Sequence, residues 1–214
     1  MRRICESELM LEPKQAKAYA QANFDSAHAL YPKLFARLFP RRKRNAVVLD
    51  LGCGPCDVTR RFAEANPRCR FHAVDGSIAM LNYAPRHPRI KLIHGRIQDV
   101  RLPRKHYDVI LSSSVLHHMR DPLVLWQAVR RWSRRGTLVF VVDLRRPATR
   151  AVARRLVRKY AANEPPILRR DFYRSLLAAF TPGEVRQQLR LAELHGLRVK
   201  TITDRHLLVV GRLR

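Results

Sequence analysis

The chain has 214 residues with 43 Lys+Arg against 17 Asp+Glu, which gives a formal net charge of +26. This length suits one domain with a substantial core and excludes a second catalytic domain. The charge favours partners such as nucleic acid, an anionic membrane surface or acidic substrates. Arginine pairs are nevertheless spread along the whole chain, from Arg2-Arg3 to Arg169-Arg170, so solvated basic faces explain the charge equally well.

The start of the chain and its cysteines indicate the compartment. Residues 1–14 lack the apolar centre of a signal peptide, and no run approaches the roughly 18 apolar residues of a membrane span. Four cysteines are too few for a disulfide framework, and the Cys53-x-x-Cys56 pair has no second pair at zinc spacing. We therefore expect a soluble, cytoplasmic protein without a metal site or a membrane span.

In chain order, the first predicted element is helical and covers 13–39, with aromatic residues at Tyr19, Phe24, Tyr31, Phe35 and Phe39. Such a stripe is typical of core packing. The alternative is a lid over a bound cofactor, and we assign residues 1–44 to an N-terminal helical lid.

After residue 45 the chain alternates between strands and helices. Strands are predicted at 46–51, 70–75, 90–94, 107–113, 136–143, 197–203 and 206–211. Several are continuous apolar runs, which is typical of strands buried on both faces of a parallel sheet. Only Asp204-Arg205 separates the last two strands, which predicts an antiparallel hairpin. The sequence thus predicts an α/β fold with a mainly parallel seven-stranded sheet, helices on both faces and a C-terminal antiparallel hairpin.

The predicted fold divides one domain, 1–214, into four parts. The lid is followed by a cofactor-binding core at 45–143, a helical substrate-covering insert at 144–196 and the closing hairpin at 197–214. Within the insert, Asn163-Glu164-Pro165-Pro166 breaks two helices, and Thr181-Pro182-Gly183-Glu184 predicts a capped helix start.

The turn after the first strand, in Val48–Cys56, is the main candidate for a ligand-binding loop. Gly52 and Gly54 allow close approach of a ligand and positive φ angles. A dinucleotide site would have G-x-G-x-x-G, but position 57 is Asp, and a carboxylate there would repel a pyrophosphate. A cationic amino-acid ligand would tolerate it.

With this order of elements, the chain resembles class I S-adenosylmethionine-dependent methyltransferases, in a group of small-molecule enzymes similar to those of quinone biosynthesis. The resemblance covers about 45–143 and implies a Rossmann-like fold that binds S-adenosylmethionine and releases S-adenosylhomocysteine. Asp50, Gly52 and Gly54 match the family's glycine-rich motif, whereas Cys56 replaces its third glycine. The resemblance places this turn, including Cys53, against the methionine part of the cofactor.

The resemblance assigns further cofactor contacts at three later strand ends. A carboxylate at Asp75 can accept both hydrogen bonds of a ribose diol. The resemblance assigns the contacts with the adenine to residues further along the chain. These predicted cofactor residues are Gly76, Ile78, Met80, Asp99, Val100 and Ser112.

The fourth predicted strand ends in Ser112–Pro122, which includes Leu116-His117-His118. Ligands of open α/β sheets gather at the carboxyl ends of the strands, so His117 or His118 is a candidate base or substrate orienter. The alternative is that one histidine supports the turn and the other packs.

The methyl acceptor is predicted to be a small molecule, possibly anionic. The Asp/Asn-Pro-Pro-aromatic sequence typical of nucleobase amine methylation is absent, and no cysteine follows Cys69. An RNA methyltransferase recruited by the basic surface, or a noncatalytic cofactor- or RNA-binding protein, remains the alternative. Arginines would clamp an anionic acceptor, and the predicted substrate-binding residues are Tyr19, His28, Tyr31, Arg145, Tyr160, Arg169, Arg170 and Tyr173.

Overall fold

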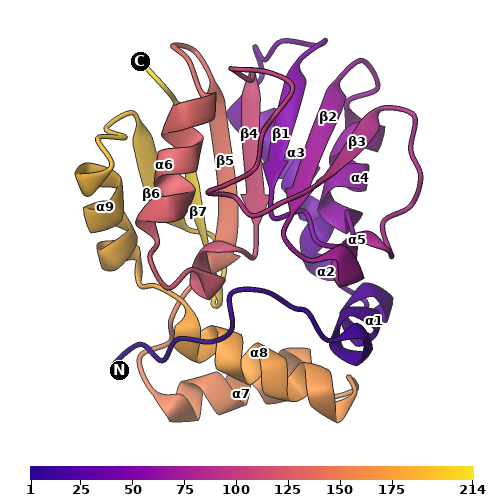
Figure 1. Ribbon diagram of the computed structural model, residues 1–214. Coiled ribbons are helices and arrows are strands. Elements are labelled where there is room, and N and C mark those ends of the chain that lie inside the picture. The colour runs from indigo at the N-terminus through magenta and orange to yellow at the C-terminus, as the bar shows by residue number, and fades with distance from the viewer.

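A computed structural model describes residues 1–214, except for the side chain of Ser26, and it contains one seven-stranded sheet (Figure 1). The strands lie in the order β3-β2-β1-β4-β5-β7-β6. Their bounds are β1 Val47–Leu51, β2 Arg70–Asp75, β3 Ile90–His94, β4 Val109–Ser113, β5 Leu138–Leu144, β6 Leu197–Thr201 and β7 His206–Arg212. The predicted α/β class and all seven predicted strands are confirmed.

Strand pairing follows the predicted pattern. The first five strands are parallel, β7 runs antiparallel to β5, and β6 pairs antiparallel with β7. The strand order reverses direction between β1 and β4, and in open α/β sheets a ligand crevice forms at such a point, outside the carboxyl ends of the strands. The topology therefore places the glycine turn after β1 and the histidines after β4 beside one crevice.

Helices cover both faces of the sheet. On one face α6 (Leu123–Trp132) and α9 (Pro182–Leu191) pack against it, and the fully buried Trp126 donates its indole N–H to Gln188 at 3.0 Å. On the other face, α3 (Leu30–Leu38) and α4 (Asp57–Ala65) meet the sheet where the rings of Phe35, Phe62 and Phe140 lie 5.5–5.9 Å apart. Burial of these apolar faces is the main stabilising term.

Two predicted boundaries differ from this arrangement. The α9 helix, which starts with the predicted capping box at Thr181 and Glu184, belongs to the sheet layer and not to a substrate-covering insert. The predicted N-terminal helix is divided into α1 (Pro13–Gln21), α2 (Asp25–His28) and α3, of which α3 packs in the core. The core interpretation thus applies to α3, and the lid over a cofactor stays a prediction for α1 and α2.

The remaining helices form a layer at the carboxyl end of the sheet. Figure 1 shows α7 (Arg150–Tyr160), α8 (Pro166–Ala178) and α1 below the sheet, with the N-terminal segment, residues 1–12, running between them and the strands. The short helices α5 (Ile78–Leu81) and η1 (Leu116–His118) lie at strand ends. Among the helices that the structure describes, none is both long and apolar enough to cross a lipid bilayer.

The N-terminal segment is fixed by contacts to distant parts of the chain. Arg3 donates to the carbonyls of Ala178, His117 and Met119, and its guanidinium lies 3.9 Å from the ring centroid of Phe180. Further along, the Ser77 hydroxyl donates to the Met10 carbonyl at 2.5 Å. The segment therefore forms one wall of the space between the sheet and α8.

Candidate active site

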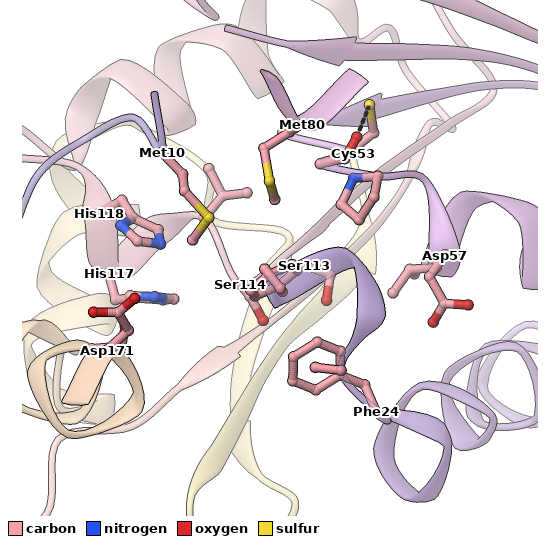
Figure 2. A pocket seen from close by; sticks show the side chains of 18 of the residues that line it. Met10, Phe24, Cys53, Asp57, Met80, Ser113, Ser114, His117, His118 and Asp171 are labelled. Atoms are coloured by element: carbon pink, nitrogen blue, oxygen red, sulfur yellow. Dashed lines mark hydrogen bonds between the residues drawn. The ribbon is translucent and has the colours of Figure 1, made fainter. Parts of the chain in front are cut away.

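A cavity of about 570 Å³ lies at the carboxyl ends of β1, β2 and β4, in the crevice that the topology predicts. Its wall comes from the glycine turn, the segments after β2 and β4, helices α1, α2 and α8, and the N-terminal segment. Figure 2 shows His117, His118 and Asp171 at one end, Cys53 and Asp57 at the other, and Met10 and Met80 between them. The volume suits a cofactor together with a small second substrate.

The glycine turn has the positive φ angles that its sequence predicts, at Gly52 (+75°) and Gly54 (+53°). A Cβ atom at Gly52 would overlap Val115 Cγ2, so the missing side chain makes room for Val115, while Gly52 itself also lines the cavity. At Gly54 the nearest atom to such a Cβ would be Met80 Cε at 3.3 Å, inside the cavity wall. Gly54 is thus the position where the missing Cβ leaves the backbone accessible.

Cys56 occupies the third glycine position of the motif with φ at 61°. This left-handed conformation explains why a glycine suits the position, since other residues adopt it at a cost. The Cys56 side chain is fully buried beside Cys53. The hydrogen bond between the two thiols and burial raise the pKa of Cys53, which favours its neutral thiol.

Asp75 lies at the end of β2 and connects it to the glycine turn. Its carboxylate accepts the backbone N–H groups of Gly54 at 2.7 Å and Ser77 at 2.8 Å. Burial raises the pKa of Asp75, while these two hydrogen bonds favour its ionised form. A carboxylate offers about four acceptor sites, so the two that remain can accept a pair of hydroxyl groups from the cavity.

The other predicted cofactor residues divide into two groups. Asp50, Cys53, Gly76 and Met80 line the cavity, as does Gln98. The predicted contacts Ile78, Asp99, Val100 and Ser112 lie outside its wall. Ile78 is 54% exposed on α5, and Val100 is buried against Gly95. The Ser112 hydroxyl donates a hydrogen bond to the Leu51 carbonyl at 2.7 Å. The alternation of β4 explains the last case, because Ser113 on the opposite face lines the cavity.

His117 is held rigidly by the end of β5. It is 3% exposed, and its Nδ1 lies 2.6 Å from Asp143 Oδ1. Asp143 also accepts the backbone N–H groups of Val115 and Leu116 at 2.8 and 2.7 Å. Burial alone would lower the pKa of His117. The charge and hydrogen bond of Asp143, together with the charge of Glu6, outweigh burial and raise the pKa above its usual value. His117 is therefore a charged, immobile support.

His118 has a ring nitrogen without a partner among the described residues, although burial and the neighbouring His117 lower its pKa to about 3, which makes it a weak base. Its Nδ1 lies 3.0 Å from the Ser7 carbonyl, which can only accept, so Nδ1 carries the proton and Nε2 the free lone pair. The lowered pKa keeps the ring neutral at pH 7. The ring lines the cavity and is a quarter exposed (Figure 2). Of the two predicted catalytic histidines, His118 has the suitable protonation state.

Glu6, on the N-terminal segment, completes this end of the cavity. Its Oε1 lies 3.3 Å from His118 Nδ1 and 3.6 Å from His117 Nε2. Carboxylate and imidazole groups in such a triangle can bind a metal ion. Here His118 Nδ1 is directed to Ser7, and His117 carries a proton between two carboxylates, so the arrangement suits a shared proton better than a metal.

Asp57 shows why this helix start does not suit a phosphate. Its carboxylate lies in the first turn of α4, 2.8 Å from His28 Nδ1 and 2.9 Å from Arg61 Nε. Burial alone would raise the pKa of Asp57. The hydrogen bonds from His28 and Arg61 outweigh burial and lower this pKa far below its usual range. A permanent negative charge therefore occupies the position that a pyrophosphate would need.

The predicted substrate residues also separate into two groups. Tyr19, His28, Tyr31 and Tyr160 line the cavity, whereas Arg145, Arg169, Arg170 and Tyr173 do not. Helical periodicity explains the difference on α8, because Leu168, Asp171, Phe172 and Ser175 form the face towards the cavity. The predicted arginine clamp for an anionic acceptor is therefore absent from the described cavity wall.

Several residues of the site were not predicted. Glu6 and Met10 belong to a segment without periodicity, and no local pattern indicated that it returns to the site. Asp143 had a detectable signal, because an acidic residue ends the apolar run Leu138–Val142 at the sheet edge where ligands bind. Arg205, on the turn before β7, and His206, the first residue of β7, reach the cavity only through the hairpin topology.

Comparison with known proteins agrees with this geometry. Residues 48–137 match a family described as "Methyltransferase domain". The malonyl-[acyl-carrier protein] O-methyltransferase of Halalkalibacterium halodurans is 30% identical over 122 residues, which are 53% of this chain and 45% of that protein. The trans-aconitate 2-methyltransferase of Mycobacterium ulcerans is 35% identical over 101 residues, 45% of this chain and 36% of that protein.

A solved structure of similar fold is a SAM-dependent methyltransferase from Aquifex aeolicus, with a TM-score of 0.67, 16% identity and coverage of 96% of this chain and 100% of that one. Over residues 48–137 this chain is similar to the methyltransferase domain family, and its fold is that of this solved methyltransferase structure. It spans less than half the length of the two curated relatives. S-adenosylmethionine is the cofactor of this class, and the expected quinone-biosynthesis group stays a prediction.

The cavity has a donor and acceptor set that fits this cofactor. Gly54 leaves the backbone open beside Asp75, and the apolar Met80 lies next to both. Among the described residues, Ser113 Oγ and Glu6 Oε1 are buried without a hydrogen-bond partner, and both residues line the cavity. Such atoms are costly unless a bound molecule or water satisfies them.

We expect Gly52→Ala to reduce the free energy of unfolding by about 2–5 kcal/mol, from about 1–2 kcal/mol of backbone strain and about 1–3 kcal/mol of overlap with Val115. Gly136→Ala is the matched control, because Gly136 has φ at +91° but open space around its Cβ position. Urea denaturation of both variants separates the two terms. Equal losses would show that Val115 does not close this position.

Proposed function

We propose that this chain binds S-adenosylmethionine across the carboxyl ends of β1 and β2 and transfers its methyl group to a small-molecule acceptor held at the end of the cavity beside His118. The observation that carries the proposal is the placement of a neutral histidine and an ionised Asp75 carboxylate on the wall of one cavity. The cofactor would supply an electrophilic methyl group on a sulfonium centre.

The residues of the chain contribute mainly position. Asp75 and the N–H groups around Gly54 hold the ribose side, and Asp50, Cys53 and Asp57 surround the amino-acid side. The N-terminal segment and α8 cover the reacting end and exclude water. Holding the two reactants in line is worth up to about 7–11 kcal/mol of the barrier, and a sulfonium needs little further activation.

His118 would accept a proton from the acceptor through Nε2. Its Nδ1 proton is fixed by the Ser7 carbonyl, and the ring packs against His117 at a centroid distance of 4.2 Å and a tilt of 37°. Asp143 positions His117, so the dyad His117–Asp143 acts on His118 by orientation and charge. This assigns catalysis to His118 and positioning to His117.

An experiment in two stages tests the proposal. First, S-adenosylhomocysteine should raise the thermal stability of the protein, whereas NAD should not. Second, labelled S-adenosylmethionine is incubated with the protein and with separate extracts of RNA and of small metabolites. Label in the metabolite fraction supports the proposal. Label in RNA at physiological salt would favour the RNA methyltransferase, and no effect of S-adenosylhomocysteine would overturn the cofactor assignment.

We expect Asp75→Asn to weaken S-adenosylhomocysteine binding by about 10- to 100-fold, because hydrogen bonds to a charged group contribute about 1.5–3 kcal/mol. Isothermal titration calorimetry measures the change. Asp99→Asn is the control, because Asp99 lies outside the cavity wall. The affinity of this variant for S-adenosylhomocysteine should stay within a factor of two of the wild-type value. A large loss for Asp99→Asn alone would restore the adenine role that the resemblance implies for Asp99.

A further inference from the structure

The cavity has the opposite charge to the rest of the molecule. Eight of the 17 acidic residues of the chain line it, but only four of the 43 Lys+Arg. The eight are Glu6, Glu8, Asp25, Asp50, Asp57, Asp75, Glu164 and Asp171. In a protein with a net charge of +26, this concentration of carboxylates in one concave surface lowers the local potential and attracts cations.

The four arginines do not offset these charges for an incoming ligand. Arg60 and Arg61 both form ion pairs with Asp57 on α4. Arg205 is bound to Asp204, and its guanidinium lies 3.4 Å from the ring centroid of Tyr160. Arg96 is exposed beside Gly76, at the cofactor side of the cavity. The acceptor end therefore offers no free arginine among the described residues that line the cavity.

At the acceptor end, carboxyl groups outnumber the imidazole that they share. Asp143 Oδ1 lies 2.6 Å from His117 Nδ1, and Glu6 Oε1 lies 3.6 Å from His117 Nε2. Glu6 Oε1 is buried and has no hydrogen-bond partner among the described residues. Burial, and to a smaller extent the charge of Asp171, raise the pKa of Glu6. Asp171 faces the same end from α8, where its carboxylate pairs with Arg170 at 3.2 Å and accepts a hydrogen bond from Gln15 at 2.8 Å.

Aromatic rings line the same space. Tyr19, Phe24, His28 and Tyr31 follow one another with centroid separations of 4.8, 5.1 and 5.5 Å, and all four line the cavity. Figure 2 shows the Phe24 ring directed into the pocket, opposite Met80. Aromatic faces combined with carboxylates bind ammonium groups, since both interact favourably with positive charge.

We propose that the methyl acceptor is a small aromatic or aliphatic amine that enters the cavity as an ammonium ion and binds between Glu6, Asp171 and the aromatic rings. This rests on the proposed methyl transfer. The ammonium loses one proton through His118 Nε2 to solvent, and the nitrogen lone pair then bonds to the methyl carbon. The carbon–sulfur bond breaks with its electron pair on sulfur, leaving a neutral thioether and a methylated ammonium.

This substrate class differs from that of the curated relatives, whose names specify a malonyl group and trans-aconitate. The family match covers 48–137, whereas Glu6, Asp171, Tyr19 and Phe24 all lie outside it. Apart from His117 and His118, these residues of the acceptor end therefore come from parts of the chain that the match does not include. Its carboxylates would repel a di- or tricarboxylate.

Three probes that share a phenyl ring test the proposal: phenethylamine, 2-phenylethanol and phenylacetate. Each is titrated by calorimetry into the protein saturated with S-adenosylhomocysteine. We expect phenethylamine to bind at least tenfold more tightly than phenylacetate, and to become labelled from S-adenosylmethionine. The proposal of an amine acceptor would be overturned if phenylacetate bound as tightly as phenethylamine or more tightly, or if none of the three probes bound. Failure of S-adenosylhomocysteine itself to bind would instead contradict the proposed function.

Variants assign the preference to the acceptor end. Glu6→Gln should weaken phenethylamine binding at least tenfold while leaving the S-adenosylhomocysteine affinity within a factor of two. Asp171→Asn provides the same readout if Glu6→Gln does not fold. Glu193→Gln is the control, because Glu193 is an exposed surface residue paired with Arg130. Unchanged phenethylamine affinity in both acidic variants would contradict the site.

Discussion

Asp143→Asn should reduce the free energy of unfolding by about 3–5 kcal/mol, the loss expected when one partner of a buried ion pair is removed. The carboxylate is 1% exposed and accepts hydrogen bonds from Val115, Leu116 and His117. It therefore connects the end of β5 to η1 and to the segment that follows β4. An asparagine of the same size presents an amide nitrogen to at least one of these donors. Urea denaturation at pH 6 measures the loss.

The effect of Asp143→Asn should depend on pH. The His117 pKa is raised above 6.5, so its contribution to stability is complete below pH 6.5 and is lost as the pH rises through the raised value. The Asp143 pKa is lowered below 3.8, so its contribution is complete above pH 3.8 and is lost as the pH falls through the lowered value. The difference between wild type and variant should therefore be largest between pH 4 and 6.5.

Controls separate this dyad from general charge effects. Asp204→Asn removes a partly exposed carboxylate that pairs with Lys159, and it should cost no more than about 1 kcal/mol. His117→Gln removes the other partner and should lose a similar amount to Asp143→Asn, while the double variant should lose less than the sum. Additive losses would show that the two groups do not interact.

His118→Asn should lower kcat by about 10²- to 10⁴-fold, the contribution typical of a positioned general base. Asparagine can place its amide N–H near the Nδ1 position, where the Ser7 carbonyl accepts, but it has nothing at the position of Nε2. The affinity for S-adenosylhomocysteine should stay within a factor of two. Steady-state kinetics with the labelled acceptor and calorimetry give the two numbers.

A matched substitution tests whether position alone matters at His118. His118→Gln places an amide closer to the Nε2 position but still offers no basic nitrogen, so it should be as slow as His118→Asn. If either variant kept wild-type kcat, or if kcat and cofactor affinity fell by the same factor, His118 would be a structural residue. That outcome would confirm the packing alternative for both histidines.

The strands and the glycine turn were predictable because they depend on local patterns. Continuous apolar runs such as Leu138–Val142 indicate strands buried on both faces, and the observed sheet contains each of them. Gly52 and Gly54 were identified from conformational freedom alone. The contact of Gly52 with Val115 was not predicted, because a sequence does not reveal that a residue 63 positions later fills the space beside it.

The acceptor end was poorly predicted because its residues come from segments far apart in the chain. Arg169 and Arg170 were chosen for their charge, but the helical phase of α8 directs Asp171 into the cavity. Glu6 lies in a segment without periodicity, and only its tertiary contacts bring it to His118. Charge inside the cavity is thus opposite to the expectation from composition, which counts the surface and the interior together.

The N-terminal segment also affects the order in which the molecule can be assembled. Ile4 donates its N–H to the Leu177 carbonyl at 3.1 Å, and Arg3 reaches Ala178, so this wall joins positions more than 170 residues apart. Closing so long a loop has an entropic cost that is recovered only after the sheet and α8 are in place. Folding should therefore complete the sheet first and the cavity last, and a refolding intermediate with native β-structure would bind no ligand at the Glu6 end.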